Sequence, residues 1–178
     1  MIPNHNYLIV SVVSPNHTDV ISELSRASTQ YGCNLLNIEV NTLGTELSAV
    51  FFLSGNWGAI AKMEAAIPAL EQRLDLTTIV RRTSEPPLNG QWMSYSLQLV
   101  AIDRIGILNG LSDFLSKMSI PIEHVSAHTY TGPSNTQMVS MILKIKVSDK
   151  MHLASLREKL MSYCDDNNLD AFIEPARH

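Results

Sequence analysis

A long internal repeat constrains the fold of this chain more than any other feature. The segment from Asn16 to Val40 matches the segment from Asp103 to Ala127 at a constant offset of 87 residues, without a gap. Apolar or small residues recur in both copies at positions i, i+1, i+4, i+7, i+8 and i+11, which indicates the same buried helix face in each. A chain of 178 residues with such a repeat is predicted to form two small domains of one fold. These positions hold Val20, Ile21, Leu24, Ala27, Ser28 and Tyr31 in the first copy and Ile107, Leu108, Leu111, Phe114, Leu115 and Met118 in the second.

The first half predicts the order strand, helix, strand, strand, helix, strand. Asn16 or Thr18 is expected to cap the first helix, which should end near Tyr31 because Gly32 follows it. Leu43-Gly44-Thr45 is typical of a hairpin turn, and Pro68 is expected to kink or divide the second helix. The four strands are expected at residues 7–13, 35–42, 46–54 and 76–83.

The second half repeats this order. Its first helix should end near Met118, and its second should contain Leu153, Leu156, Leu160 and Tyr163. Its strands are expected at residues 92–101, 122–130, 138–147 and 169–174. We therefore predict an α+β chain of two ferredoxin-like βαββαβ units, each an antiparallel sheet with helices on one face. Residues 1–83 should form the first domain, 84–91 a linker rich in proline, and 92–178 the second domain.

Composition narrows the functional classes. A formal net charge of −4 argues against a dominant nucleic-acid footprint, which needs a basic patch, and the small cluster of Arg73, Arg81 and Arg82 is expected to be a solvated strand end. No apolar run approaches the roughly 18 residues of a membrane span, and no secretory signal is evident. With two cysteines, one in each half, a cytoplasmic location is the expectation.

RNA binding is an alternative, because RNA-recognition modules share the βαββαβ order. Those modules stack bases on strand aromatics, whereas the central strands here carry Val40, Ala127 and Met141 at the positions considered. An enzyme is a second alternative, but no catalytic motif occurs, so we expect a chain that is not an enzyme and has no cofactor.

Three stretches of the chain resemble the signature of ACT domains. They are Val100 to Leu108 followed by Ile120 to Val125 in the second half, and Gly32 to Ile38 in the first half. ACT domains are regulatory modules that pair through their sheets and bind amino acids at the interface. The resemblance therefore implies a small amino acid as ligand.

A narrower resemblance, carried mainly by the first half, is to two-domain ACT regulators of glycine cleavage. It rests on Leu53-Ser54-Gly55-Asn56-Trp57 and Leu74-Asp75-Leu76. It implies a transcriptional regulator that responds to glycine through a partner DNA-binding activator, without contacting DNA itself. An ACT module that controls an enzyme of amino-acid metabolism in trans is the alternative, and a homodimer is left open.

The loop before the first helix of the second half is the main candidate ligand site. Free N–H groups at a helix N-terminus, from Gly106 to Ile107, suit a carboxylate, and Gly106 lets a ligand approach the backbone. Asp103 offers an acceptor for an ammonium group and Arg104 a fork for a carboxylate, with Ile105 between them and Gly106. The alternative is that Asp103 only caps the helix and Arg104 is a solvated charge.

The matching loop of the first half departs from this pattern. Asn16-His17-Thr18-Asp19 has no glycine, and the charge of Asp19 would repel a ligand carboxylate. This half-site is therefore expected to be altered or silent, although Asn16, His17 and Asn34 are kept as candidate ligand contacts in the first half.

Other reactive side chains have structural explanations. His124 and His128 share one face of a strand, but a metal site needs three or four ligands, so we expect edge-strand histidines and no metal. Cys33 is expected to be a buried structural thiol, since no activating histidine pattern surrounds it.

Overall fold

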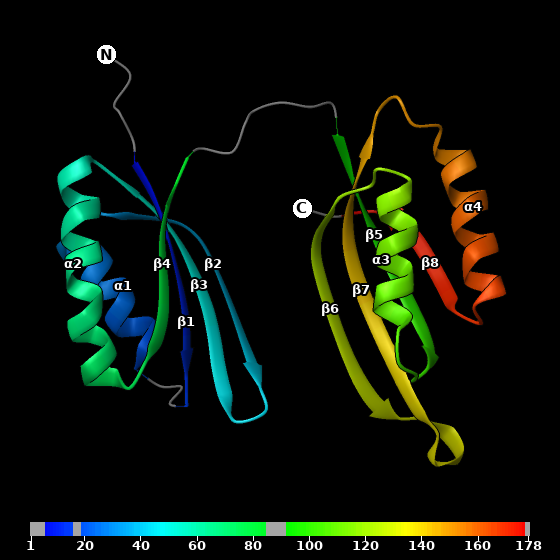
Figure 1. The fold of residues 1–178 in the computed structure, drawn as a ribbon, viewed down its shortest axis with the longest axis horizontal. Helices are drawn as coiled ribbons and strands as arrows, with labels where there is room; N and C mark the ends of the chain where they lie inside the picture. Colours follow the sequence, from blue (N-terminus) through cyan, green and yellow to red (C-terminus); the bar gives the residue numbers. More distant parts are fainter. Residues whose placement is uncertain (1–5, 16–18, 85–91, 177–178) are drawn as a thin grey trace. The chain divides into compact units, whose positions relative to one another are not determined.

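A computed structural model describes residues 6–15, 19–84 and 92–176 of the chain. The chain divides into two compact units, residues 1–87 and residues 88–178, which we call the first and second units and describe separately. Each unit is a four-stranded antiparallel sheet with two helices on one face (Figure 1). This confirms the predicted α+β class and the two ferredoxin-like βαββαβ units.

The first unit has strands β1 (Asn6–Ser14), β2 (Asn34–Leu43), β3 (Glu46–Gly55) and β4 (Thr77–Thr83). Its helices are α1 (Val20–Gln30) and α2 (Trp57–Leu74), and the sheet order is β2-β3-β1-β4. Alternate residues of β1 face the helices, so Leu8, Val10 and Val12 are almost fully buried. Gly44 lies in the left-handed region, with φ of 64°, in the two-residue turn that joins β2 to β3.

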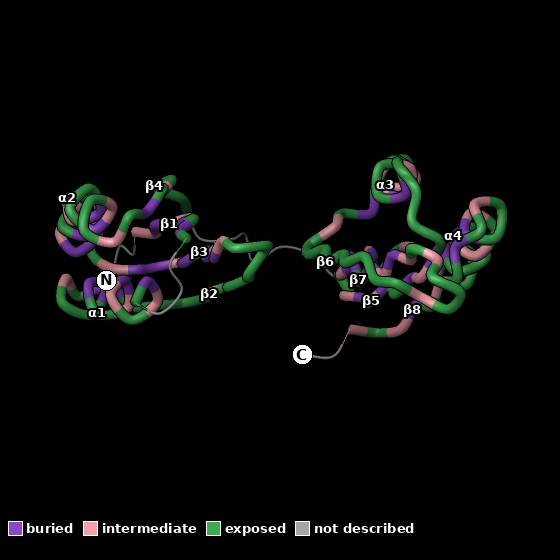
Figure 2. The backbone as a smooth tube through the Cα atoms, turned by 90° about the horizontal axis from the view of Figure 1, so that it is seen from below, coloured by how far each residue is buried: buried purple, intermediate pink, exposed green. Residues whose placement is uncertain are grey.

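The second unit repeats this architecture with strands β5 (Trp92–Ile102), β6 (Ile122–Thr131), β7 (Gln137–Ser148) and β8 (Asp170–Pro175). Its helices are α3 (Ile107–Lys117) and α4 (Leu153–Asp166), and a 3-10 turn, η1 (Pro133–Asn135), joins β6 to β7. The sheet order β6-β7-β5-β8 is that of the first unit. Each unit has its own hydrophobic core between helices and sheet, as the buried positions in Figure 2 show.

Several local predictions need correction. Residue Asp19, not Asn16 or Thr18, stands at the N-cap of α1, and Asn16 and Thr18 lie outside the described residues. Pro68 does not divide α2, which runs as one helix of 18 residues. A proline removes one N–H donor from a helix. The helix continues because Ile67 and Leu70 on either side of Pro68 are anchored in the core.

The edge strands β2 and β6 are exposed on both faces along most of their length (Figure 2). Val125 lies opposite the buried Leu143 of β7, yet it is 41% exposed. The helices therefore cover the inner strands of each sheet and leave most of β2 and β6 outside the core.

Candidate functional site

The loop between β5 and α3 has the backbone geometry of an open helix N-terminus. Gly106 is the N-cap residue, with φ of 92°, and its carbonyl accepts the first helical hydrogen bond from the N–H of Gly110 at 2.9 Å. No side chain caps the first turn of α3. A Cβ atom added at Gly106 would meet nothing within 4 Å, so the space above this backbone is open. The amide groups that follow Gly106 can therefore face a ligand.

Asp103 does not cap α3, so the alternative that it serves only as a helix cap is wrong. Its backbone N–H donates to the carbonyl of Gln137 at 2.9 Å and fixes the loop to the start of β7. Its exposed carboxylate has no hydrogen bond or ion pair to any described residue. The side chain is thus available to accept a hydrogen bond from a ligand.

Arg104 is not simply solvated, because its guanidinium Nη2 donates to the carbonyl of Asn167 at 3.0 Å. Asn167 is the C-cap of α4, where the helix dipole favours a positive charge. Arg104 therefore connects the loop to the end of α4, and only its remaining N–H groups can contact a carboxylate.

Two isoleucines of the candidate site differ sharply in exposure. Ile105 is fully exposed, whereas Ile107 is 4% exposed and packs in the core of the second unit. Ile107 can therefore contribute to a ligand site only through its backbone. Ile105 is free to cover an apolar part of a ligand or partner.

In the first unit, Asn16 and His17 lie outside the described residues. Asn34 is exposed at the start of β2, opposite Ser54 of β3. The structure therefore groups Asp103, Arg104, Ile105, Gly106 and Ile107 in one loop of the second unit, and it places Asn34 in the first unit.

The remaining candidate groups have structural roles. Cys33 and Cys164 are buried free thiols, and burial raises the pKa of both. His124 and His128 are exposed on β6, and no three potential metal ligands cluster anywhere in the described ranges. No helix of those ranges is long and apolar enough to cross a membrane.

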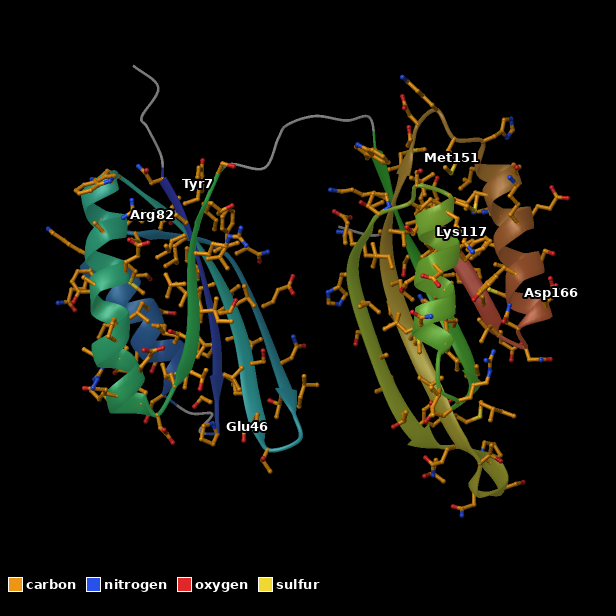
Figure 3. All side chains as sticks on the ribbon, in the orientation of Figure 1. Tyr7, Glu46, Arg82, Lys117, Met151 and Asp166 are labelled. Carbon is orange, nitrogen blue, oxygen red and sulfur yellow. The ribbon has the colours of Figure 1, made fainter. Side chains whose placement is uncertain are left out.

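Two arginines of the expected cluster, Arg73 and Arg82, form ion pairs, whereas Arg81 is exposed on β4. Arg73 belongs to α2 and contacts Glu23 of α1, with Nη2 and Oε2 2.5 Å apart. Arg82 binds both carboxylate oxygens of Glu64 at 2.6 to 3.0 Å and lies over the ring of Trp57. Figure 3 labels Arg82 near the helical layer of the first unit.

The sheet faces bear on the RNA-binding alternative. Met141 is buried beneath the helices, so it could not face a base in any case. The exposed face of the first sheet instead carries Tyr7 and Phe52, whose rings stack on one another with centroids 5.6 Å apart. The acidic net charge of the chain remains unfavourable for nucleic acid.

Comparison with known proteins gives the class. ACT-domain family models match residues 6–81 and residues 90–165, and together these matches account for most of the chain. The chain belongs to the ACT-domain family and carries two ACT domains in tandem, which correspond to the two units.

The more specific similarity is to the glycine cleavage system transcriptional repressors of Escherichia coli K12 and Shigella flexneri. Each is 27% identical over 84 residues, which is 47% of this chain and 44% of the relative. The match therefore spans less than half the length of these curated relatives.

Two solved structures share the fold over nearly the whole chain. One is described as a glycine cleavage system transcriptional repressor, with 21% identity, a TM-score of 0.76 and coverage of 98% of this chain and 99% of its own. The other is an unknown protein from Galdieria sulphuraria, with 18% identity, a TM-score of 0.81 and coverage of 98% and 100%. At these identities the likeness establishes the fold alone.

Proposed function

We propose that this chain is a cytoplasmic, amino-acid-responsive regulator of glycine cleavage gene transcription, and that it is not an enzyme. The open N-terminus of α3 at Gly106 carries the ligand part of this proposal, because it offers uncapped amides beside a free carboxylate at Asp103. A small zwitterion would place its carboxylate on the amides and its ammonium group on Asp103. The similarity to glycine cleavage repressors supports glycine as the ligand.

The output of the regulator is proposed to pass through a partner DNA-binding activator. The net charge of −4 supports indirect action, since a direct DNA contact relies on lysine and arginine against phosphates. The exposed Ile105 within the ligand loop supports a partner surface coupled to the ligand, because covering an apolar side chain there is favourable. Assembly as a homodimer is part of the same proposal.

Calorimetric titration of the full chain with glycine and the other amino acids tests the ligand site. Gly106→Ala should weaken binding at least about tenfold, because alanine disfavours a left-handed φ and puts a methyl group against the ligand. Gly44→Ala is the matched control, since Gly44 is also left-handed with open space around it but lies in a remote turn. Equal effects of the two substitutions would contradict the assignment of the loop.

Asp103→Asn tests the ammonium contact separately. It should weaken binding of glycine at least about tenfold, because the neutral amide no longer offers a charged acceptor to the ammonium group. Asp113→Asn on the exposed side of α3 is the control.

A glycine-responsive reporter, with and without these substitutions, tests the regulatory output. Gly106→Ala should abolish the response of the reporter to glycine. The purified chain alone should not bind promoter DNA in a gel-shift assay at low salt. Binding of the chain alone to DNA, falling steeply with salt, would contradict indirect action. An unchanged reporter together with altered activity of an amino-acid enzyme would favour control of that enzyme in trans.

A further inference from the structure

The two helices of the first unit border a cleft that the functional proposal does not use. The cleft lies between α1 and α2, on the helical layer, and encloses about 270 Å³. That volume is close to the lower limit of about 300 Å³ for small-molecule sites. Its lining residues are Glu23, Arg26, Ala27, Gln30 and Tyr31 on or next to α1, and Ala66, Ala69, Leu70 and Arg73 on α2.

Charged groups in this cleft are unbalanced. The carboxylate of Glu23 contacts Arg73 across the cleft at 2.5 Å and also pairs with Arg26 on its own helix. The hydrogen bond from Arg73 lowers the pKa of Glu23, so this carboxylate is ionised at neutral pH. Two guanidinium groups therefore face one carboxylate, and the cleft has a net charge of one positive unit.

The guanidinium groups can contact a ligand without leaving Glu23. The side chains of Arg26 and Arg73 are 68% and 56% exposed, whereas that of Glu23 is only 15% exposed. Each guanidinium has five N–H donors, and Glu23 uses few of them. The free donors suit a second, planar carboxylate, which arginine can bind with two parallel hydrogen bonds.

Three alanines line the cleft. Ala27, Ala66 and Ala69 line the walls, so a molecule the size of a short carboxylic acid can enter between the helices. Gln30 and Tyr31 add one amide and one hydroxyl group at the same cleft. These groups can pair with a hydroxyl or keto group on the ligand.

The second unit shows what the same helix pair does without these residues. At the offset of 87 residues, Gly110, Asp113 and Phe114 replace Glu23, Arg26 and Ala27. Phe114 stacks on Tyr163 of α4 with ring centroids 4.5 Å apart, so an aromatic ring stands where the first unit has Ala27.

In contrast to the α1–α2 cleft, the cleft between α3 and α4 has balanced charges. Its charged lining residues are Lys117 and Lys159 against Glu158 and Asp166, and Figure 3 labels Lys117 on α3 and Asp166 on α4. The positive cleft is therefore a feature of the first unit and does not follow from the fold itself.

We propose that the α1–α2 cleft binds a small organic acid with one carboxylate and one further hydroxyl or keto group. The carboxylate lies between Arg26 and Arg73 and neutralises the excess positive charge, while Gln30 and Tyr31 contact the second polar group. Because Arg26 and Arg73 lie on different helices, the bound acid ties α1 to α2. This site is independent of the β5–α3 loop.

Titration of the full chain with sodium lactate, followed by calorimetry and by amide chemical shifts, tests the site. A ligand of this size should bind with a dissociation constant of about 1 to 10 mM. Shift changes should be confined to α1 and α2 of the first unit. Absence of binding at lactate concentrations well above this dissociation constant would overturn the proposal. Inorganic phosphate that binds as tightly as lactate would overturn it as well.

Two pairs of variants separate the cleft from the surrounding surface. Ala66→Leu fills the cleft and should weaken lactate binding at least about tenfold, whereas Ala65→Leu on the exposed side of α2 should not. Arg73→Gln should weaken binding by a similar factor, while Arg81→Gln on the open sheet face removes the same charge without effect. Equal effects within either pair would overturn the proposal.

Thermal melts of each variant check that the fold is intact, and Gly106→Ala shows that the two sites are distinct. Lactate binding should survive Gly106→Ala unchanged, since that substitution lies in the other unit. Loss of lactate binding in Gly106→Ala would overturn the assignment to the α1–α2 cleft.

Discussion

Cys164 is a buried core residue whose pKa is raised by its surroundings. Its side chain is 1% exposed on the inner face of α4, and burial raises the pKa of its thiol from 9.0 to about 11. The neutral thiol is therefore the form that the folded state accepts, since a thiolate there would lose its hydration.

This pKa predicts a loss of stability in alkali. The folded pKa lies above the unfolded one, so the contribution of Cys164 is complete below pH 9 and is lost as the pH rises toward 11. At pH 11 the loss should be about 2 kcal/mol. Denaturant unfolding of the wild type and Cys164→Ala at several values of pH measures it. The difference between the two curves should shrink above pH 9, and parallel curves would contradict the prediction.

The candidate ligand loop shows which site residues can be predicted from sequence. The segment Asp103 to Gly106 stands between a strand and a helix in the repeat, so its place at the helix entrance follows from the pattern. The contact of Arg104 with Asn167 could not be predicted from the sequence, because 63 residues separate the two. No sequence pattern at the end of α4 indicates that it contacts this loop. The ion pair of Glu23 with Arg73, which are 50 residues apart, could not be predicted for the same reason.

At the scale of elements, helix capping differs between the two domains. Asn56 caps α2 by accepting a hydrogen bond from the N–H of Ala59 at 2.8 Å, whereas His152 at the N-cap of α4 makes no side-chain cap. The caps of α1 and α3 lack side-chain hydrogen bonds as well. Among the four N-cap residues, Asn56 is therefore the one whose side chain accepts a hydrogen bond from a described residue of its own helix.

Removing this cap should destabilise the first domain. Asn56→Ala should cost about 1 kcal/mol, since an N-cap amide is lost and the amide of Ala59 is left without its partner. His152→Ala, which removes a side chain from an N-cap without breaking a cap hydrogen bond, should change stability by less than about 0.5 kcal/mol. Urea denaturation of both variants measures the effect. A cost for His152→Ala as large as that for Asn56→Ala would contradict it.

The order and type of the elements could be predicted because their periodicity is strong and occurs twice. The predictions that were wrong concern properties that depend on tertiary contacts. Leu108 belongs to the predicted buried face of α3 but is 37% exposed, because it lies at the first turn beside the open loop. Likewise, Pro68 could not be judged without knowing that core contacts on both sides hold α2 together.

At the scale of the whole molecule, two separate cores hold the fold. Leu24 and Leu111 occupy equivalent positions in the repeat, and both are at most 1% exposed, each in the core of its own domain. Nothing in either set of core residues comes from the other domain. The offset of 87 residues is thus a repeat of packing as well as of sequence.

Two separate cores predict domain-specific destabilisation. Leu24→Ala should cost about 2 to 5 kcal/mol in the first domain and leave the second unchanged, and Leu111→Ala should do the reverse. Hydrogen exchange resolved by residue measures the two domains separately. Equal loss of protection in both domains from either substitution would show that they unfold as one cooperative unit.

Burial of both native thiols makes the chain suitable for distance measurements. The chain has two cysteines, and Cys33 and Cys164 are 8% and 1% exposed, so neither should react readily with a spin label in the native state. Cysteines introduced at exposed positions such as Ala65 and Asp113 would then be the sites that label, one in each domain. Pulsed electron paramagnetic resonance on this doubly labelled chain could follow the spacing of the two ACT domains as glycine or lactate is added.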